Sequence, residues 1–106
     1  MEFSVLIQRA VEIRKRYAEL EQKLYGRSWT GEEVVLGFVG DVGDLAKLVL
    51  AKSGVRSIPD AWQRLAHEIA DCLWSVLVIA HLCDVDLERA FRHTMDELEQ
   101  HIASKV

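Results

Sequence analysis

Residues 34–50 read VVLGFVGDVGDLAKLVL, an apolar run that is interrupted by two aspartates three positions apart. Residues 68–80 read EIADCLWSVLVIA, a second apolar run with two acids at the same spacing. Residues i and i+3 lie on the same face of a helix, so each run directs two carboxylates one way. Charged side chains are rarely buried unless they are paired or bind metal. The sequence therefore predicts a divalent-metal site formed by Asp41, Asp44, Glu68 and Asp71.

The pattern on either side of these runs predicts an all-α fold. Apolar residues recur at intervals of three and four along the first part of the chain, which is typical of an amphipathic helix. Four helices with short connections favour an antiparallel four-helix bundle of one domain, residues 1–106. The expected helices run from Ser4 to about Leu24, from about Gly31 to Lys52, from Pro59 to about Leu82, and onward from a cap at Asp84 or Asp86, with Leu87, Ala90, Phe91, Leu98 and Ile102 as the inner face of the last.

Several helix boundaries have recognisable signals. Thr30 followed three residues later by Glu33 fits a capping box at the start of the second helix. Ser53-Gly54 is expected to end that helix, residues 55–58 to form a connector, and Pro59 to occupy the first turn of the third helix. Both central helices are apolar on many faces, which predicts that homo-oligomerisation completes the bundle.

Composition excludes some classes of function. The chain has 106 residues, half of them hydrophobic, and 17 acids against 13 bases, so it has no basic footprint for nucleic acid. Cys72 and Cys83 lack zinc-type spacing and are expected to be reduced thiols in a cytoplasmic protein. The longest apolar run, residues 72–80, is too short to span a membrane, and the N-terminus has no signal-peptide pattern, so no membrane partner is expected.

Oxygen ligands from carboxylates suit Mg²⁺, with Mn²⁺ as a substitute, and such ions commonly bridge to substrate phosphates. Ions held there can neutralise the charge of a breaking phosphoanhydride and activate water. The alternative is that the acids are solvated, or paired with Lys47 and Arg64. A di-iron site is a weaker alternative, because His67 lies beside Glu68 and not three residues after it.

Three further side chains are candidates for substrate binding. Lys47 follows Asp44 by three residues and Arg64 precedes Glu68 by four, so each can meet a substrate phosphate or pair with its neighbouring acid. Trp29 can stack on a nucleobase, or pack in the core or as a hydrophobic staple at the start of the second helix. Trp62 and Trp74 are expected in the core or at a subunit interface.

Two stretches resemble the MazG-type all-α nucleoside triphosphate pyrophosphohydrolases, and most closely the dCTP pyrophosphatase-type branch. That family has Glu-x-x-Glu on one helix and Glu-x-x-Asp on the next. Residues 38–46, FVGDVGDLA, are similar to the first motif, with aspartates in place of glutamates. Residues 67–74, HEIADCLW, match the second, and the resemblance covers roughly Leu36 to Met95.

The resemblance implies a homodimer or homotetramer that uses Mg²⁺ to cut a nucleoside triphosphate between its α and β phosphates. Such an enzyme clears surplus or noncanonical nucleotides. Thr94 and Leu98 stand where the family often has a Lys and an Asn that contact substrate. These departures keep a second interpretation open, in which the chain is a catalytically weak relative that binds nucleotide or a protein partner. A purely structural helical oligomer is a third.

Overall fold

The computed structural model of the protein describes residues 2–54 and 57–105. Within these ranges the chain forms helices and no strands, which confirms the all-α class. The first helix, α1, spans Phe3–Tyr25, close to the expected range. It ends at Gly26, which adopts a left-handed conformation with φ of 75° and donates its N–H to the carbonyl of Gln22. Glycine tolerates this conformation without a steric penalty, so it is a favourable C-terminal cap.

The second helix, α2, spans Gly31–Lys52, as predicted. Its capping box is present: the hydroxyl of Thr30 accepts the backbone N–H of Glu33, and a carboxylate oxygen of Glu33 accepts the backbone N–H of Thr30. Arg27 holds the same carboxylate through two hydrogen bonds of 2.6 and 2.9 Å. The segment before α2 is therefore fixed to its first turn.

The third helix, α3, spans Ala61–Leu82 and begins later than expected. Pro59 lies in a turn and not in the first helical turn, so that prediction was wrong. The reason is local: Asp60, the residue before the helix, adopts a left-handed conformation with φ of 54°, which separates Pro59 from the helical backbone. Of the predicted connector 55–58, Val55 and Arg56 lie outside the described residues.

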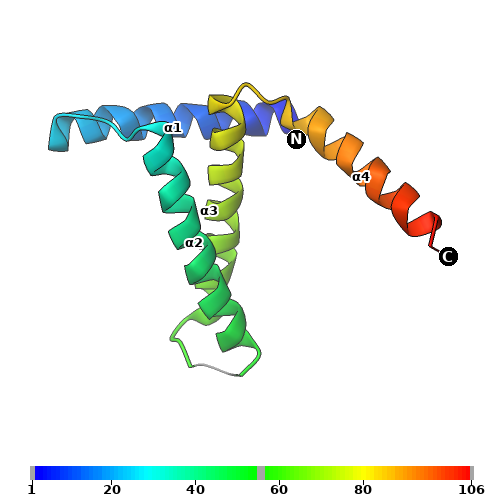
Figure 1. Ribbon diagram of the computed structural model, residues 1–106. Coiled ribbons are helices and arrows are strands. Elements are labelled where there is room, and N and C mark those ends of the chain that lie inside the picture. The colour runs from blue at the N-terminus through cyan, green and yellow to red at the C-terminus, as the bar shows by residue number, and fades with distance from the viewer. Residues whose placement is uncertain (1, 55–56, 106) are drawn as a thin grey trace.

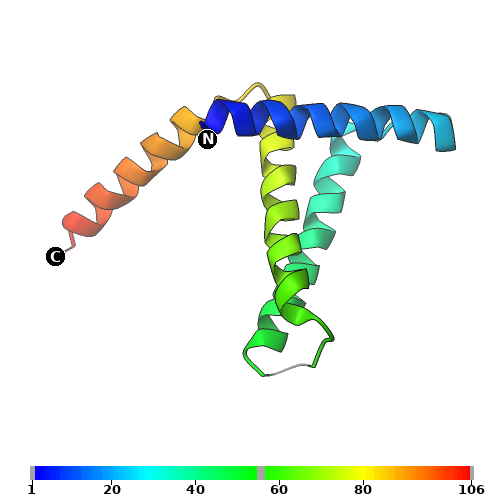
Figure 2. The same ribbon diagram turned by 180° about the vertical axis from the view of Figure 1, so that it is seen from behind.

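Helices α2 and α3 pack side by side in antiparallel orientation, and α1 crosses the end of this pair where α2 begins and α3 ends (Figures 1 and 2). The indole N–H of Trp74 on α3 donates to the carbonyl of Ala10 on α1 over 3.0 Å, which ties the two helices together. The small core lies along these contacts, and its buried apolar side chains are Ala10, Leu48, Leu65, Leu77 and Val78.

The fourth helix, α4, spans Leu87–Ala103 and is capped by Asp86, whose carboxylate accepts the N–H of Arg89. Of the two expected caps, Asp86 is therefore the one used. Figure 1 shows α4 projecting away from the other helices. Most of its expected inner face is exposed within the described residues: Phe91 is 58% exposed and Ile102 63%. The bundle formed by a single chain is therefore open on this side.

By length and composition alone, α3 is long and apolar enough to cross a membrane. Core helices of soluble proteins pass the same test, so the property is weak evidence. The helix also carries Glu68 and Asp71 in its first half, which are costly inside a bilayer. The absence of a membrane partner stays a prediction.

Candidate metal centre and the adjacent cavity

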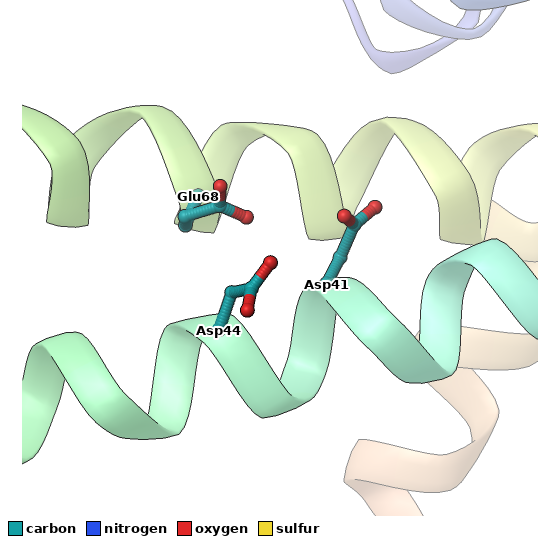
Figure 3. Close-up of side chains that lie close together, drawn as sticks. All are labelled: Asp41, Asp44 and Glu68. Atoms are coloured by element: carbon teal, nitrogen blue, oxygen red, sulfur yellow. The ribbon is translucent and has the colours of Figure 1, made fainter.

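Three of the four predicted acids come together between α2 and α3. Asp41 and Asp44 lie one helical turn apart on α2, and Glu68 faces them from α3 (Figure 3). One carboxylate oxygen from each of the three lies within 4.8 Å of the others. The i,i+3 spacing on α2 and the antiparallel packing of α3 produce this arrangement. We call these three residues the acid cluster.

The acid cluster is electrostatically unfavourable without a cation. Burial raises the pKa of Asp41, and the negative charges of Asp71 and Asp44 add to the effect. Burial likewise raises the pKa of Glu68, followed by the charges of Asp41, Asp71 and Asp44. The Oε2 atom of Glu68 is buried and has no hydrogen-bond partner among the described residues. A buried carboxylate oxygen left without a partner is costly, and a bound cation would remove that cost.

Asp71, the fourth predicted ligand, is near the acid cluster but its carboxylate is not part of it. Its Oδ2 atom lies 3.2 Å from Nε2 of His67, one turn earlier on α3. Its charge still reaches the cluster, because it raises the pKa values of both Asp41 and Glu68. His67 thus pairs with Asp71 and lies outside the acid cluster. A di-iron site would require a histidine ligand within the cluster.

The predicted phosphate-binding cations are exposed. Lys47 lies one turn after Asp44 on α2, and Arg64 lies one turn before Glu68 on α3. Neither side chain forms an ion pair within residues 2–54 and 57–105. The alternative in which they neutralise the acids structurally therefore has no support in the described part of the chain.

The donor set of the acid cluster fits a hard divalent cation. All its donors are carboxylate oxygens, the ligands that Mg²⁺ and Mn²⁺ favour. The Oε2 atom of Glu68 gives an independent indication of a metal site. If Glu68 served only to pair with a Lys or Arg side chain, this oxygen would have that side chain as a partner. The cluster is therefore a candidate site for a divalent metal ion.

A cavity of about 280 Å³ opens beside the acid cluster, and Asp41 lines it. Its other walls come from α1, from the start of α2 and from the second half of α3. Its aromatic lining is supplied by Tyr17, Trp29, Phe38 and Trp74. A pocket with aromatic walls and a few polar groups is typical of small-molecule sites, and aromatic rings are good stacking partners for a nucleobase.

Trp29 is fixed in this wall by its backbone and by its ring. Its backbone N–H donates to Oε1 of Glu21 over 2.8 Å. Its ring lies against Gly37, where an added Cβ would be 3.0 Å from the ring. Glycine at position 37 thus leaves room for the indole. Val34, the residue that Trp29 would contact in a hydrophobic staple, lines the same cavity. Trp29 can therefore pack as a staple and also stack on a base.

Sequence reasoning missed the polar side of the cavity. Arg14 and Glu21 on α1 form two hydrogen bonds of 2.9 Å, with side chains only 16% and 12% exposed, and both line the cavity. An amphipathic helix such as α1 commonly presents its charged residues to solvent. Their spacing of seven residues, which places opposite charges on one helix face, was the available signal. Trp74, expected in the core or at an interface, also lines the cavity.

The raised pKa values of Asp41 and Glu68 predict a pH dependence of stability in metal-free protein. Over part of the pH range the folded chain retains protons on Asp41 and Glu68 that the unfolded chain has released. Below the ordinary pKa values of 3.8 and 4.5 both states are protonated, so the two groups do not lower the free energy of unfolding there. The free energy of unfolding should fall as pH rises through the raised values, and Mg²⁺ should restore it. The measurement is urea unfolding with a chelator across this pH range.

The matched control is the Asp41→Asn/Glu68→Gln double variant, which lacks both titrations. This comparison is needed because Glu33, whose pKa is lowered to about 2, acts in the opposite direction. The difference in unfolding free energy between the double variant and the wild type should grow with pH. A constant difference across the range would refute the electrostatic account of the cluster.

The chain is similar to curated proteins named dCTP pyrophosphatase 1. It is 35% identical to the protein of Rattus norvegicus over 98 residues, 84% of this chain and 56% of that protein. The protein of Mus musculus is 33% identical over 98 residues, again 84% of this chain and 56% of the relative. That of Bos taurus is 32% identical over 94 residues, 80% of this chain and 54% of the relative.

These similarities agree with the two acidic motifs and the all-α fold. The chain belongs to the MazG-like all-α nucleoside triphosphate pyrophosphohydrolase superfamily. It spans about half the length of the curated relatives it matches, 56% of the rat protein and 54% of the bovine one. No family model matches the chain, and no solved structure matches it.

Proposed function

We propose that the protein is a Mg²⁺-dependent nucleoside triphosphate pyrophosphohydrolase. It would convert a (d)NTP and water to a (d)NMP and pyrophosphate, and so remove unwanted nucleotides from the pool. The observation that carries the proposal is the acid cluster at the edge of an aromatic cavity, with Asp41 common to both. The relatives named dCTP pyrophosphatase 1 support the same reaction class.

Asp41, Asp44 and Glu68 would hold the metal, with Asp71 as a fourth ligand once its carboxylate turns away from His67. These are also the residues to which we assign catalysis. Bound Mg²⁺ would stabilise the charge that develops as the phosphoanhydride breaks, and would lower the pKa of an attacking water. Mn²⁺ has the same ligand preference and should substitute.

The substrate would lie across the cavity and the acid cluster. Trp29 lines the cavity and would stack on the base, which places the triphosphate toward Asp41. Lys47 and Arg64, which are exposed near the acids, would contact phosphate oxygens. Water adds to the triphosphate as the bond between the α and β phosphates breaks, leaving a monophosphate and pyrophosphate.

We also propose that the protein is a cytoplasmic homo-oligomer. Apolar side chains are exposed on α4 and also on α2, where Leu36 is 71% exposed and Val39 63%. Covering them by a second copy would remove a large apolar surface from water. Light scattering should give the mass of a dimer or tetramer, and a monomer mass at working concentration would refute the proposal.

The proposed cytoplasmic location has a separate basis. Cys83 is free and exposed, which suits a reducing compartment.

The second candidate function is a catalytically weak protein that binds nucleotide or a protein partner. The observation in its favour lies on α4, where Thr94 and Leu98 replace the family's Lys and Asn. Both are exposed on a helix that projects away from α2 and α3, the helices that carry the acid cluster (Figure 1). A single chain therefore supplies no substrate contact from these positions.

A nucleotide panel separates the two functions. The protein is incubated with common and modified nucleoside triphosphates and Mg²⁺ or Mn²⁺, and pyrophosphate and monophosphate are followed separately. If the protein is an enzyme, pyrophosphate and monophosphate should be released in equal amounts from at least one nucleotide. A chelator should abolish this release. Metal and nucleotide binding without release from any nucleotide would favour the binding protein.

A further inference from the structure

The polar wall of the cavity holds an arginine whose hydrogen bonds are only partly used. Arg14 donates from Nη1 to Oε2 of Glu21 and from Nη2 to Oε1, each over 2.9 Å. This end-on arrangement uses two of the five guanidinium N–H groups. The carboxylate is held in turn, because its Oε1 also accepts the backbone N–H of Trp29 over 2.8 Å.

The remaining donors of Arg14 have a defined geometry. A guanidinium bound end-on by Nη1 and Nη2 keeps a second parallel pair of N–H groups on its side, one on Nε and one on Nη2. Among the described residues, Glu21 is the only hydrogen-bond acceptor of Arg14. Because Arg14 lines the cavity, a ligand there would lie within reach of its guanidinium.

We propose that Arg14 determines which base the cavity accepts, and that it selects cytosine or guanine. The inference rests on the proposed function, since it assumes that the cavity holds the base of the substrate. Two parallel N–H donors require two adjacent acceptors on the ligand. Cytosine has such a pair in N3 and O2, and guanine has one in N7 and O6.

The other bases lack this pattern. Adenine places its N6 amino donor beside N7 and beside N1, so a group with only donors meets one acceptor and one donor. Thymine and uracil have an N–H between their two carbonyl groups. Each of these bases leaves one N–H of the largely buried guanidinium without a partner, which costs affinity.

Glu21 acts as the positioning residue of this arrangement. It fixes the orientation of the guanidinium through both carboxylate oxygens, and it fixes Trp29 through the backbone N–H. The edge of the base and its face would therefore be recognised by groups that share one carboxylate. The pKa of Glu21 is lowered, mainly by the hydrogen bond from Arg14, so the carboxylate stays charged around neutral pH.

The test measures binding without hydrolysis. Affinities of the α,β-imido analogues of dCTP, dGTP, dTTP and dATP are determined by calorimetry in Mg²⁺ for the wild type and for Arg14→Lys. Lysine keeps the positive charge beside Glu21 but lacks the paired donors. The wild type should prefer the cytosine and guanine analogues by about ten- to a hundredfold, and the variant should lose most of that preference.

Arg16→Lys is the matched control, because Arg16 is on the same helix but is exposed and paired with Glu12. It should keep the wild-type preference. If Arg14→Lys does not fold, Arg14→Gln replaces it, since its amide still donates to Glu21. A wild type without preference, or a preference that survives in the Arg14 variant, would overturn the inference.

The two proposals fail separately. A protein that binds the analogues with the expected preference but hydrolyses no nucleotide contradicts the proposed function and supports the role of Arg14. Hydrolysis together with an unchanged base preference in Arg14→Lys supports the proposed function and contradicts the role of Arg14. If no analogue binds, both are wrong.

Discussion

The Glu68→Gln variant is expected to lose hydrolysis by roughly a thousandfold, the size of effect that follows removal of a principal stabiliser of transition-state charge. Glutamine has nearly the same shape as glutamate but removes a negative charge from the acid cluster. It also replaces a carboxylate that has one oxygen buried without a partner. Mn²⁺ affinity, measured by calorimetry, should fall in parallel, because the same carboxylate binds the metal.

The matched control is Glu99→Gln, an exposed acid on α4, which should leave metal affinity and hydrolysis unchanged. Metal-free Glu68→Gln should also be more stable than the wild type, because repulsion among the acids falls. A variant that binds Mn²⁺ as tightly as the wild type would contradict the assignment of the acid cluster. Asp71→Asn separately tests whether the fourth acid binds metal, since in the structure its carboxylate pairs with His67.

The Trp29→Ala variant is expected to raise KM by about ten- to a hundredfold, because stacking of one base on an aromatic ring contributes about 1–3 kcal/mol. The value of kcat should change much less, since the ring lines the cavity and does not belong to the acid cluster. Steady-state kinetics with Mg²⁺ provide both values. The matched control is Trp62→Ala, a 64% exposed tryptophan outside the cavity.

A gentler version of this experiment uses two glycines on α2. A Cβ at Gly37 would lie 3.0 Å from the ring of Trp29, whereas a Cβ at Gly40 has no neighbour within 4 Å. Gly40→Ala should therefore leave KM unchanged and stabilise the helix by about 1 kcal/mol. Gly37→Ala should displace the indole and raise KM. Equal KM values in the two variants, or a fall in kcat with unchanged KM for Trp29→Ala, would refute the stacking role.

The helices were predictable from the sequence because their signals are local. Thr30 and Glu33 placed the start of α2 correctly, and Gly26 ended α1 as glycine commonly does. Pro59 misled the prediction because a single left-handed residue, Asp60, separates it from α3. The inner face predicted for α4 requires a partner that a single chain does not supply, and the periodicity of one helix cannot say which surface covers it.

The acid cluster was partly predictable for a similar reason. The i,i+3 spacing places Asp41 and Asp44 on one face, and the apolar surroundings of Glu68 favour packing toward them. The side-chain rotamer of Asp71 depends on whether its carboxylate pairs with His67 or binds a cation. The spacing of residues along the helix does not determine this. Arg14 and Glu21 are on the same helix, but their burial in the cavity wall depends on how α1 crosses the other helices. That crossing arises from tertiary packing, so charge spacing within α1 alone was not sufficient to find the polar wall of the cavity.

The most direct test of the proposed function is a ³¹P NMR time course of dCTP with the protein and Mg²⁺. We predict that the three triphosphate signals decline together, while one signal of pyrophosphate and one of dCMP grow in equimolar amounts. The Glu68→Gln variant should leave the triphosphate unchanged over the same period. Appearance of orthophosphate with dCDP, or equal turnover by the wild type and the variant, would contradict the account.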